Sequence, residues 1–246
     1  MSNKTYFALI VIIILIVASI AAYYRFSPSE GPNSTETVTG LNVGDIFIYE
    51  MTGYAEPYIG SDKPADFYVP KNFVDVNSTK YYRIEITKVE PPIISFVATW
   101  EFKNGTSISY DYMVNINDGS FNGGEDRFGS SECYRAIYAA GLTAGSLSRP
   151  ASPDEEIINE TRIESFNNVN REINYLRTEF EAYDYDDKTY STLCHVYLYI
   201  QFDKQMGIMT NYRSIQVYSA DAIILTIDYK IVDSNTGPFH TGTFLR

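Results

Sequence analysis

Few residues of this chain have types and spacings that suit catalysis. Cys194 directly precedes His195, and the chain contains one other histidine, His240. A histidine activates a cysteine thiol only when the two side chains lie within hydrogen-bond reach. Consecutive residues of a β-strand point to opposite faces, so this pair is poorly placed for nucleophilic chemistry. Because Gly-x-Ser-x-Gly, phosphate-loop and zinc-ligand spacings are also lacking, we predict a protein that is not an enzyme and binds no cofactor.

Two acidic clusters could serve a metal ion or acid–base chemistry. The run 118–123, Asp-Gly-Ser-Phe-Asn-Gly, resembles the first half of a calcium loop, but the twelfth position, which should be Glu, is Gly129. Asp184, Asp186 and Asp187 lie in a predicted hairpin turn, where paired carboxylates could exchange protons with a substrate. Asp, Asn and Gly are also ordinary residues of exposed turns, so we predict no metal ligand and no catalytic residue in either cluster.

The cysteines and the Asn-x-Ser/Thr sites bear on where the protein is located. Cys133 and Cys194 are the only cysteines, and outside the cytoplasm an isolated pair often forms a disulfide. Two buried free thiols are the alternative, because the sequence does not show whether the pair approaches. After the predicted anchor, four sites could accept a glycan, Asn33, Asn77, Asn104 and Asn159. They are compatible with an exterior location, although a few such sites arise by chance.

An uncharged segment near the N-terminus predicts a membrane anchor. Tyr6 to Tyr24 is a run of nineteen residues without a charge, flanked by Lys4 and Arg25. As a helix it would span about 28 Å, enough to cross a bilayer core. We expect residues 1–25 to be a single-pass anchor that places the rest of the chain outside the cytoplasm. A cleaved signal segment is the alternative, because residues 19–21 could serve as a cleavage site.

Composition indicates one acidic, β-rich domain behind a tether. The net charge of −12 repels phosphate backbones and argues against nucleic acid as a partner. The 22 tyrosines and 14 phenylalanines suit the half-buried surface of a sheet. Residues 26–40 contain two prolines and two glycines and are predicted to form a flexible tether. Residues 41–246 follow as a single extracytoplasmic domain.

Alternating hydrophobicity predicts most of the strands of that domain. They are expected at 46–51, 81–89, 93–102, 107–116, 157–166, 171–183, 190–202, 208–218 and 222–232, with Asn104-Gly105 and Asn167-Asn168 as turns. One short helix is expected from about Ser131 to Ala140. Short connections make the sheet antiparallel. The predicted fold is therefore mainly β, with nine to ten strands in one strongly curved, half-barrel-like sheet, or alternatively in a sandwich.

The stretch from Gly53 to Lys80 is predicted to be an irregular segment that covers one face or an open edge of the sheet. It contains three prolines and five aromatic residues, Tyr54, Tyr58, Phe67, Tyr68 and Phe73. Long loops in compact domains are often functional, so a ligand site could lie beneath it. The alternative is that these aromatic residues complete the hydrophobic core.

Three short stretches carry a resemblance. Residues 43–49 (Val-Gly-Asp-Ile-Phe-Ile-Tyr), 169–173 (Val-Asn-Arg-Glu-Ile) and 202–209 (Phe-Asp-Lys-Gln-Met-Gly-Ile-Met) resemble uncharacterised archaeal membrane-anchored exported proteins. This resemblance covers most of residues 41–232 and implies no activity. At the level of the fold, the strand meander with a helix is similar to the half-barrel of lipoprotein carriers, which hold acyl chains in an apolar concavity.

These observations favour a binding function over catalysis. We expect a membrane-anchored binding module outside the cytoplasm, possessing a site for an apolar or lipid-like ligand. The alternative is a structural or interaction protein of the cell envelope, without a small-molecule ligand. A deep apolar pocket would favour the first function, and a filled core with exposed strand edges would favour the second.

Overall fold

The computed structural model describes residues 37–58, 76–123, 135–152, 156–186, 189–218 and 223–243. These residues all belong to one compact unit, Thr37–Arg246. The anchor that the sequence predicts at residues 1–25, and most of the tether, lie outside the described residues. Within the described ranges, no helix combines the length and the apolar character needed to cross a membrane.

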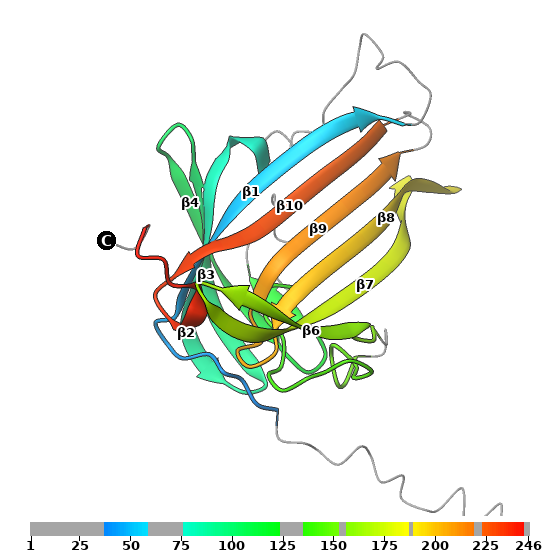
Figure 1. Cartoon of the computed structure of the whole chain (residues 1–246). Helices are drawn as coiled ribbons and strands as arrows, with labels where there is room; N and C mark the ends of the chain where they lie inside the picture. Colours follow the sequence, from blue (N-terminus) through cyan, green and yellow to red (C-terminus); the bar gives the residue numbers. More distant parts are fainter. Residues whose placement is uncertain are drawn as a thin grey trace, which may run out of the picture. The chain divides into compact units, whose positions relative to one another are not determined.

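The described part of the chain forms a single antiparallel sheet of ten strands (Figure 1). The strands are β1 (Ile46–Pro57), β2 (Thr79–Glu90), β3 (Ile93–Phe102), β4 (Ser107–Asn115), β5 (Phe121–Gly123), β6 (Glu160–Phe166), β7 (Val169–Asp186), β8 (Thr189–Asp203), β9 (Met209–Tyr218) and β10 (Ile223–Ser234). The prediction of a mainly β, antiparallel fold with nine to ten strands is confirmed. Because all ten strands share one sheet, the alternative of a two-sheet sandwich is wrong.

The sheet consists of two meanders joined through the first and last strands. Its order is β5-β4-β3-β2-β1-β10-β9-β8-β7-β6, so β1 and β10 are neighbours at the centre and β5 and β6 are the edges. Tight turns set the register within each meander. Asn167 and Asn168 adopt positive φ angles of 48° and 66° between the paired residues Phe166 and Val169, as a two-residue hairpin turn requires.

The sheet changes direction between β1 and β2. β1 pairs with β10 from Phe47 to Pro57, but with β2 only from Ile46 to Tyr49. In Figure 1, β1 continues beside β10, β9, β8 and β7, while β2, β3 and β4 run in another direction. Consequently the ring of Tyr82 on β2 reaches Tyr229 on β10, two strands away, with 5.7 Å between centroids.

One hydrophobic core lies against one face of the sheet, which we call the inner face. It joins side chains of β1, β2, β3, β4, β8, β9 and β10. An aromatic cluster occupies its middle, with centroid distances of 5.0 Å for Tyr82–Trp100, 5.7 Å for Tyr49–Tyr82 and 5.3 Å for Tyr212–Tyr229. Burying each of these large side chains removes enough apolar surface from water to stabilise the fold by roughly 1.5–3 kcal/mol.

The helix predicted from Ser131 to Ala140 is not formed by the described residues of that segment, 135–140. Ile137 instead makes a β-bridge with Ile208, and the Tyr138 amide donates to the Gly207 carbonyl at 2.7 Å. Ala136 to Ala139 are all buried, so the run has no solvent-facing side, unlike an amphipathic helix. Pairing with the turn between β8 and β9 satisfies its backbone groups in place of helical hydrogen bonds.

The irregular segment predicted from Gly53 to Lys80 is shorter than expected. β1 extends to Pro57 and β2 begins at Thr79, so both ends of the segment are strand residues. A helical element that the sequence did not predict is the 3-10 helix η1 (Gly237–Phe239) after β10. Its Pro238 and Phe239 are buried.

Candidate binding face of the sheet

The candidate site is a region of the inner face that we call the inner patch. It comprises three successive inner-facing residues from each of five neighbouring strands. These are Gly53, Ala55 and Pro57 on β1, Ile227, Leu225 and Ile223 on β10, Ser214, Gln216 and Tyr218 on β9, Leu198, Val196 and Cys194 on β8, and Thr178, Phe180 and Ala182 on β7. Residues directly opposite each other on antiparallel strands point to the same side, so the register itself assembles the patch.

The inner patch contains no charged side chain, whereas the reverse side of the same strand segments contains several. The charged residues of the reverse side are Glu56, Arg177, Glu179, Glu181, Arg213 and Asp228. Arg213 and Asp228 form an ion pair there, with 2.6 Å between Nε and Oδ1. The two faces of this part of the sheet therefore differ sharply in polarity.

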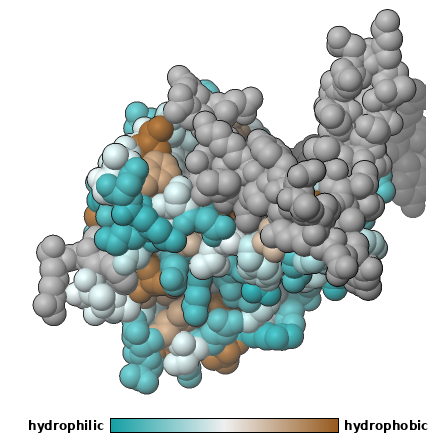
Figure 2. All heavy atoms as spheres, turned by 90° about the horizontal axis from the view of Figure 1, so that it is seen from above, coloured by the Kyte–Doolittle hydropathy of each residue, from teal (hydrophilic) through white to brown (hydrophobic). Residues whose placement is uncertain are grey.

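Figure 2 shows one face of the described chain, seen from above. Hydrophobic residues occur there in several separate places among hydrophilic ones. Scattered exposed apolar residues are normal on a soluble domain and need no functional explanation. The inner patch differs because its apolar residues lie together on neighbouring strands, β1 and β10 on one side of β9 and β7 and β8 on the other.

A row of polar side chains on β9 crosses the inner patch. Tyr218 donates its hydroxyl to Gln216 Oε1 at 2.9 Å, and Gln216 Nε2 donates to Ser214 Oγ at 3.4 Å. Gln216 lies between Leu225 on β10 and Val196 on β8. Ser214 is buried, and Gln216 and Tyr218 are half-buried. These three residues place an amide and two hydroxyl groups within apolar surroundings.

Strand β9 is inverted relative to the usual pattern of a half-buried strand. Its polar residues Ser214 and Gln216 face the core, while Ile215 and Val217 lie on the opposite side. Strands normally bury the apolar members of such an alternation and expose the polar ones. Departures of this kind from local pattern are expected at functional sites.

The apolar part of the inner patch is only partly buried. Val196, Leu198, Ile223, Leu225 and Ile227 are buried. Phe180, in the same row as Val196 and Gln216, exposes 44% of its surface although it is on the inner face. The patch therefore presents at least one large aromatic side chain that the rest of the chain leaves accessible.

The aromatic cluster beside the patch is fixed by the backbone. Tyr49 is fully buried, and its hydroxyl donates to the Met209 carbonyl at 2.7 Å. Burial raises the pKa of Tyr49 well above its ordinary value of about 10, so the phenol is neutral at physiological pH. Tyr49 is therefore a structural residue of the aromatic cluster.

Cys194 is the one nucleophilic side chain of the inner patch. Its thiol is buried, and burial raises its pKa, an effect that a hydrogen bond with Tyr218 partly opposes. A raised pKa leaves the thiol protonated and unreactive near neutral pH. Cys194 pairs with Ala182 and His195 with Glu181, so the cysteine and histidine lie on opposite faces as the sequence predicts. Cys133 lies outside the described residues, and the disulfide stays a prediction.

Two of the five aromatic residues predicted to cover a ligand are described. Tyr54 belongs to β1 and lies on its outer side, next to Thr226, with 47% of its surface exposed. Tyr58 follows β1 and is 40% exposed. Phe67, Tyr68 and Phe73 lie outside the described residues. The described chain leaves β1 beside the patch, because Pro57 is paired with Ile223.

The Asn-x-Ser/Thr sites at Asn77, Asn104 and Asn159 are all exposed, and Asn33 lies outside the described residues. Asn104 Oδ1 accepts hydrogen bonds from the amide and the hydroxyl of Thr106, at 2.9 and 2.7 Å, in the turn between β3 and β4. Asn77 Oδ1 accepts from the Gly53 amide at 3.1 Å. Asn159 Oδ1 accepts from the Arg177 amide at 2.6 Å. Glycosylation of these residues stays a prediction.

The acidic clusters take local structural roles where they are described. Asp118 accepts the Ser120 amide at 2.8 Å and the Asn115 side-chain amide at 3.0 Å. The hydrogen bonds from Ser120 lower the pKa of Asp118 below its ordinary value. Residues 124–130 and Asp187 lie outside the described residues. In the part of the chain that is described, no three His, Cys, Asp or Glu side chains gather as metal ligands would.

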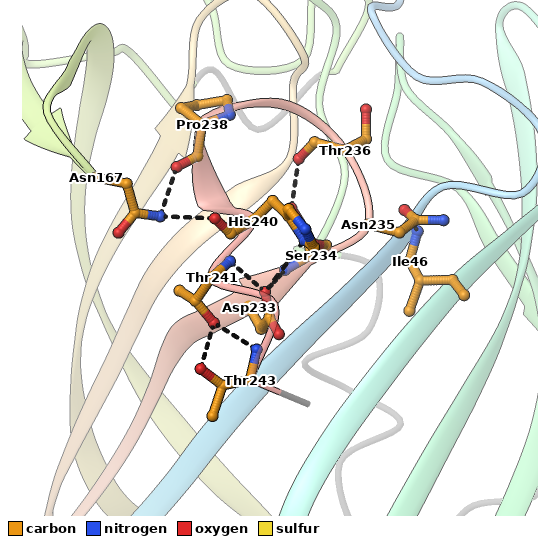
Figure 3. Close-up of polar contacts among 10 residues, drawn as sticks. All are labelled: Ile46, Asn167, Asp233, Ser234, Asn235, Thr236, Pro238, His240, Thr241 and Thr243. Atoms are coloured by element: carbon orange, nitrogen blue, oxygen red, sulfur yellow. Dashed lines mark hydrogen bonds and ion pairs between the residues drawn. The ribbon is translucent and has the colours of Figure 1, made fainter. Parts of the chain in front are cut away.

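His240 belongs to a polar network that fastens the C-terminal segment (Figure 3). Buried Asp233 accepts the amides of Ser234 and Thr241, at 2.9 and 2.6 Å. His240 Nδ1 donates to the Ser234 carbonyl at 2.6 Å, and Asn167 donates to the carbonyls of Pro238 and His240 at 2.9 and 3.1 Å. These bonds hold the segment after β10 against the β6–β7 turn, a structural role.

The residues that best define the site, Ser214, Gln216 and Tyr218, were not singled out by the sequence analysis. Their strand was predicted, but alternation alone places Ile215 and Val217 on the buried side. The register with β8 and β10 assigns the faces instead. Comparison of the chain with protein families, with curated proteins and with solved structures gave no match.

Proposed function

We propose that the domain is a binding module for an apolar or lipid-like ligand, which the inner face of the sheet holds as a half-barrel would. We further propose that residues 1–25 tether it to the membrane, outside the cytoplasm. The observation that carries the binding function is the inverted strand β9, which directs Ser214 and Gln216 into an otherwise apolar face. Ligand sites are mostly apolar and contain a few polar groups that orient the ligand.

Core packing alone is a weaker explanation for this row of residues. A side-chain amide removed from water costs about 1–3 kcal/mol unless it is fully hydrogen-bonded. Gln216 has one contact of 2.9 Å and one long contact of 3.4 Å, both to side chains of its own strand. A leucine or valine at this position would complete a core at lower cost. The amide of Gln216 therefore favours a surface that binds another molecule over a filled core.

A role as a structural or interaction protein of the cell envelope is the second candidate. Ile163 on the edge strand β6 is 71% exposed, and Val169, the first residue of β7, is 47% exposed. An exposed edge strand can pair with another chain. However, β6 also contains Glu160, Arg162 and Glu164, and charged residues on an edge oppose such pairing. The inner patch therefore carries the stronger argument.

Photolabelling of the full chain in lipid nanodiscs tests the binding function. A diazirine-bearing hexadecane is expected to label peptides of β8 and β10 that contain the inner patch. Val196→Trp fills the patch and should lower this labelling at least about fivefold, because overfilled apolar sites exclude ligand. Val217→Trp, next to Gln216 on the opposite face, is the matched control and should leave labelling unchanged.

A second variant keeps the test independent of core overpacking. Phe180→Glu changes an exposed residue of the same row, so thermal unfolding should shift little while labelling of the patch falls. Labelling restricted to residues 1–25 in the unmodified protein would contradict the binding function and favour the envelope role.

A further inference from the structure

The inner patch also restricts the chemistry of the ligand, an inference that rests on the proposed binding function. We infer that the ligand is an uncharged long-chain molecule with an oxygen atom at one end, and that Gln216 donates a hydrogen bond to this oxygen. A long-chain alcohol, ester or quinone has this chemistry, whereas a fatty acid, a sulfonate or a phospholipid does not. Three observations carry the inference.

The first observation is that the inner patch contains no charged side chain. None of the side chains of the inner patch is ionisable to a cation, and none is a carboxylate. The nearest ion pair on these strands, Arg213–Asp228, lies on the outer side, and its two groups satisfy each other. An ionised headgroup without a counter-charge is strongly disfavoured in apolar surroundings. The net charge of the chain, −12, disfavours anions further.

The second observation is an amide hydrogen that the described residues do not use. A glutamine side chain has two N–H donors. Gln216 Nε2 makes one contact, with Ser214 Oγ at 3.4 Å, and Tyr218 already occupies Oε1 as a donor. Because Gln216 is half-buried, the remaining N–H is available to a ligand oxygen, which is an acceptor in alcohols, esters and quinones alike.

The third observation is the position of Gln216 within the inner patch. Gln216 lies in the middle row of the patch, with Val196 and Phe180 on one side and Leu225 and Ala55 on the other. Apolar residues thus flank the amide in both directions across the sheet. A ligand whose oxygen meets Gln216 can direct an alkyl chain toward Phe180 on one side or Ala55 on the other, the two apolar residues of this row that keep accessible surface. The polar row of β9 is where the ligand head binds, and the neighbouring strands bind its chain.

Two photoprobes of equal chain length test the inference in the full chain in nanodiscs. One is a diazirine-bearing hexadecanol and the other a diazirine-bearing hexadecyl sulfonate, which is charged at every accessible pH. We expect the alcohol to label β8 and β10 peptides at least about fivefold more than the sulfonate, because the sulfonate would bring a charge into apolar surroundings that contain no counter-charge. Equal or stronger labelling by the sulfonate would overturn the inference.

Glutamine variants assign the preference to one residue. In Gln216→Leu, the ratio of labelling by the alcohol to labelling by the diazirine-bearing hexadecane, which has no oxygen, should fall at least about fivefold, because the hydrogen bond to the ligand oxygen is lost. Gln201→Leu, on the outer side of β8, is the matched control and should retain the ratio of the unmodified protein. An unchanged ratio in Gln216→Leu would overturn the assignment. If neither probe labels the patch, the binding function itself is wrong, whereas labelling without preference removes only the inference about the ligand head.

Discussion

Two polar side chains of the inner face, Tyr49 and Gln216, differ in the kind of hydrogen-bond partner that each one has. Tyr49 donates to a backbone carbonyl, that of Met209, and is fully buried. Gln216 contacts only side chains of its own strand and is half-buried. A backbone partner fixes a side chain in one position, whereas side-chain partners can rearrange. Tyr49 therefore belongs to the framework, and Gln216 is suited to meet a ligand.

The raised pKa of Tyr49 predicts a stability difference that depends on pH. At pH 8, Tyr49→Phe should lower the free energy of unfolding by about 1–2 kcal/mol, because the Met209 carbonyl loses its donor. Above about pH 10 the unfolded chain releases the Tyr49 proton while the folded chain keeps it. The folded state then binds more protons, so Tyr49 adds a fall in stability with rising pH that the variant lacks.

Urea unfolding of both proteins between pH 8 and pH 11 measures this difference. The difference in free energy of unfolding between the two proteins should narrow above pH 10. The other tyrosines are common to both proteins and do not contribute to this change. A gap that stays constant or widens would show that burial does not hold Tyr49 in its protonated form.

At the scale of elements, the turn between β8 and β9 determines where the 135–140 segment lies. Gly207 has a φ of 77°, and a Cβ added there would lie 2.1 Å from the Tyr138 carbonyl oxygen. Only glycine permits this approach, and the approach allows the bridge between Ile137 and Ile208. The segment 135–140 therefore pairs with this turn and does not form the helix that its local sequence predicts.

Replacing two glycines that have similar positive φ angles should separate the cost of backbone strain from the cost of a steric clash with Tyr138. Gly141→Ala, at φ 79° with open space around its Cβ position, should cost about 1–2 kcal/mol in unfolding free energy. Gly207→Ala carries the same strain and also displaces Tyr138, so we expect a loss of at least about 3 kcal/mol. Equal losses in thermal unfolding would show that the segment does not depend on this contact.

Local patterns predicted the strands well but not their partners or faces. Alternation and turn residues identified the strands because both signals are local, and the Asn104-Gly105 and Asn167-Asn168 turns were found where predicted. The inner face of β9 was not predictable, since Gln216 is placed by its neighbours Leu225 and Val196 and not by its own sequence. The same tertiary contacts overrode the helical pattern near Ile137.

At the scale of the whole molecule, the pairing of β1 with β10 was also beyond prediction. Both strands are apolar and alternating, as are most others, and nothing in either sequence designates the other as its neighbour. The pairing nevertheless unites the two meanders into one inner face. The inner patch depends on it, because Ala55 and Leu225 lie on opposite sides of this junction.

The proposed membrane anchor, residues 1–25, predicts whether the full chain stays with the membrane fraction. If residues 1–25 are an uncleaved anchor, the protein should stay in the membrane pellet after an alkaline carbonate wash, because an inserted apolar helix is not released by pH or salt. Immunoblotting of pellet and supernatant measures this. Release into the supernatant, together with an N-terminus near Ala22, would show that the segment is a cleaved signal.

Pairing of the first strand with the last also constrains when the protein can fold. The first meander, β1 to β5, joins strands that are neighbours in sequence, so it can assemble while the later strands are still being synthesised. The β1–β10 pairing must wait until the entire domain has emerged, and during that interval β1 presents an unpaired edge that can associate with other chains. A chain that is exported as it is made would therefore need a chaperone to shield β1 until β10 arrives.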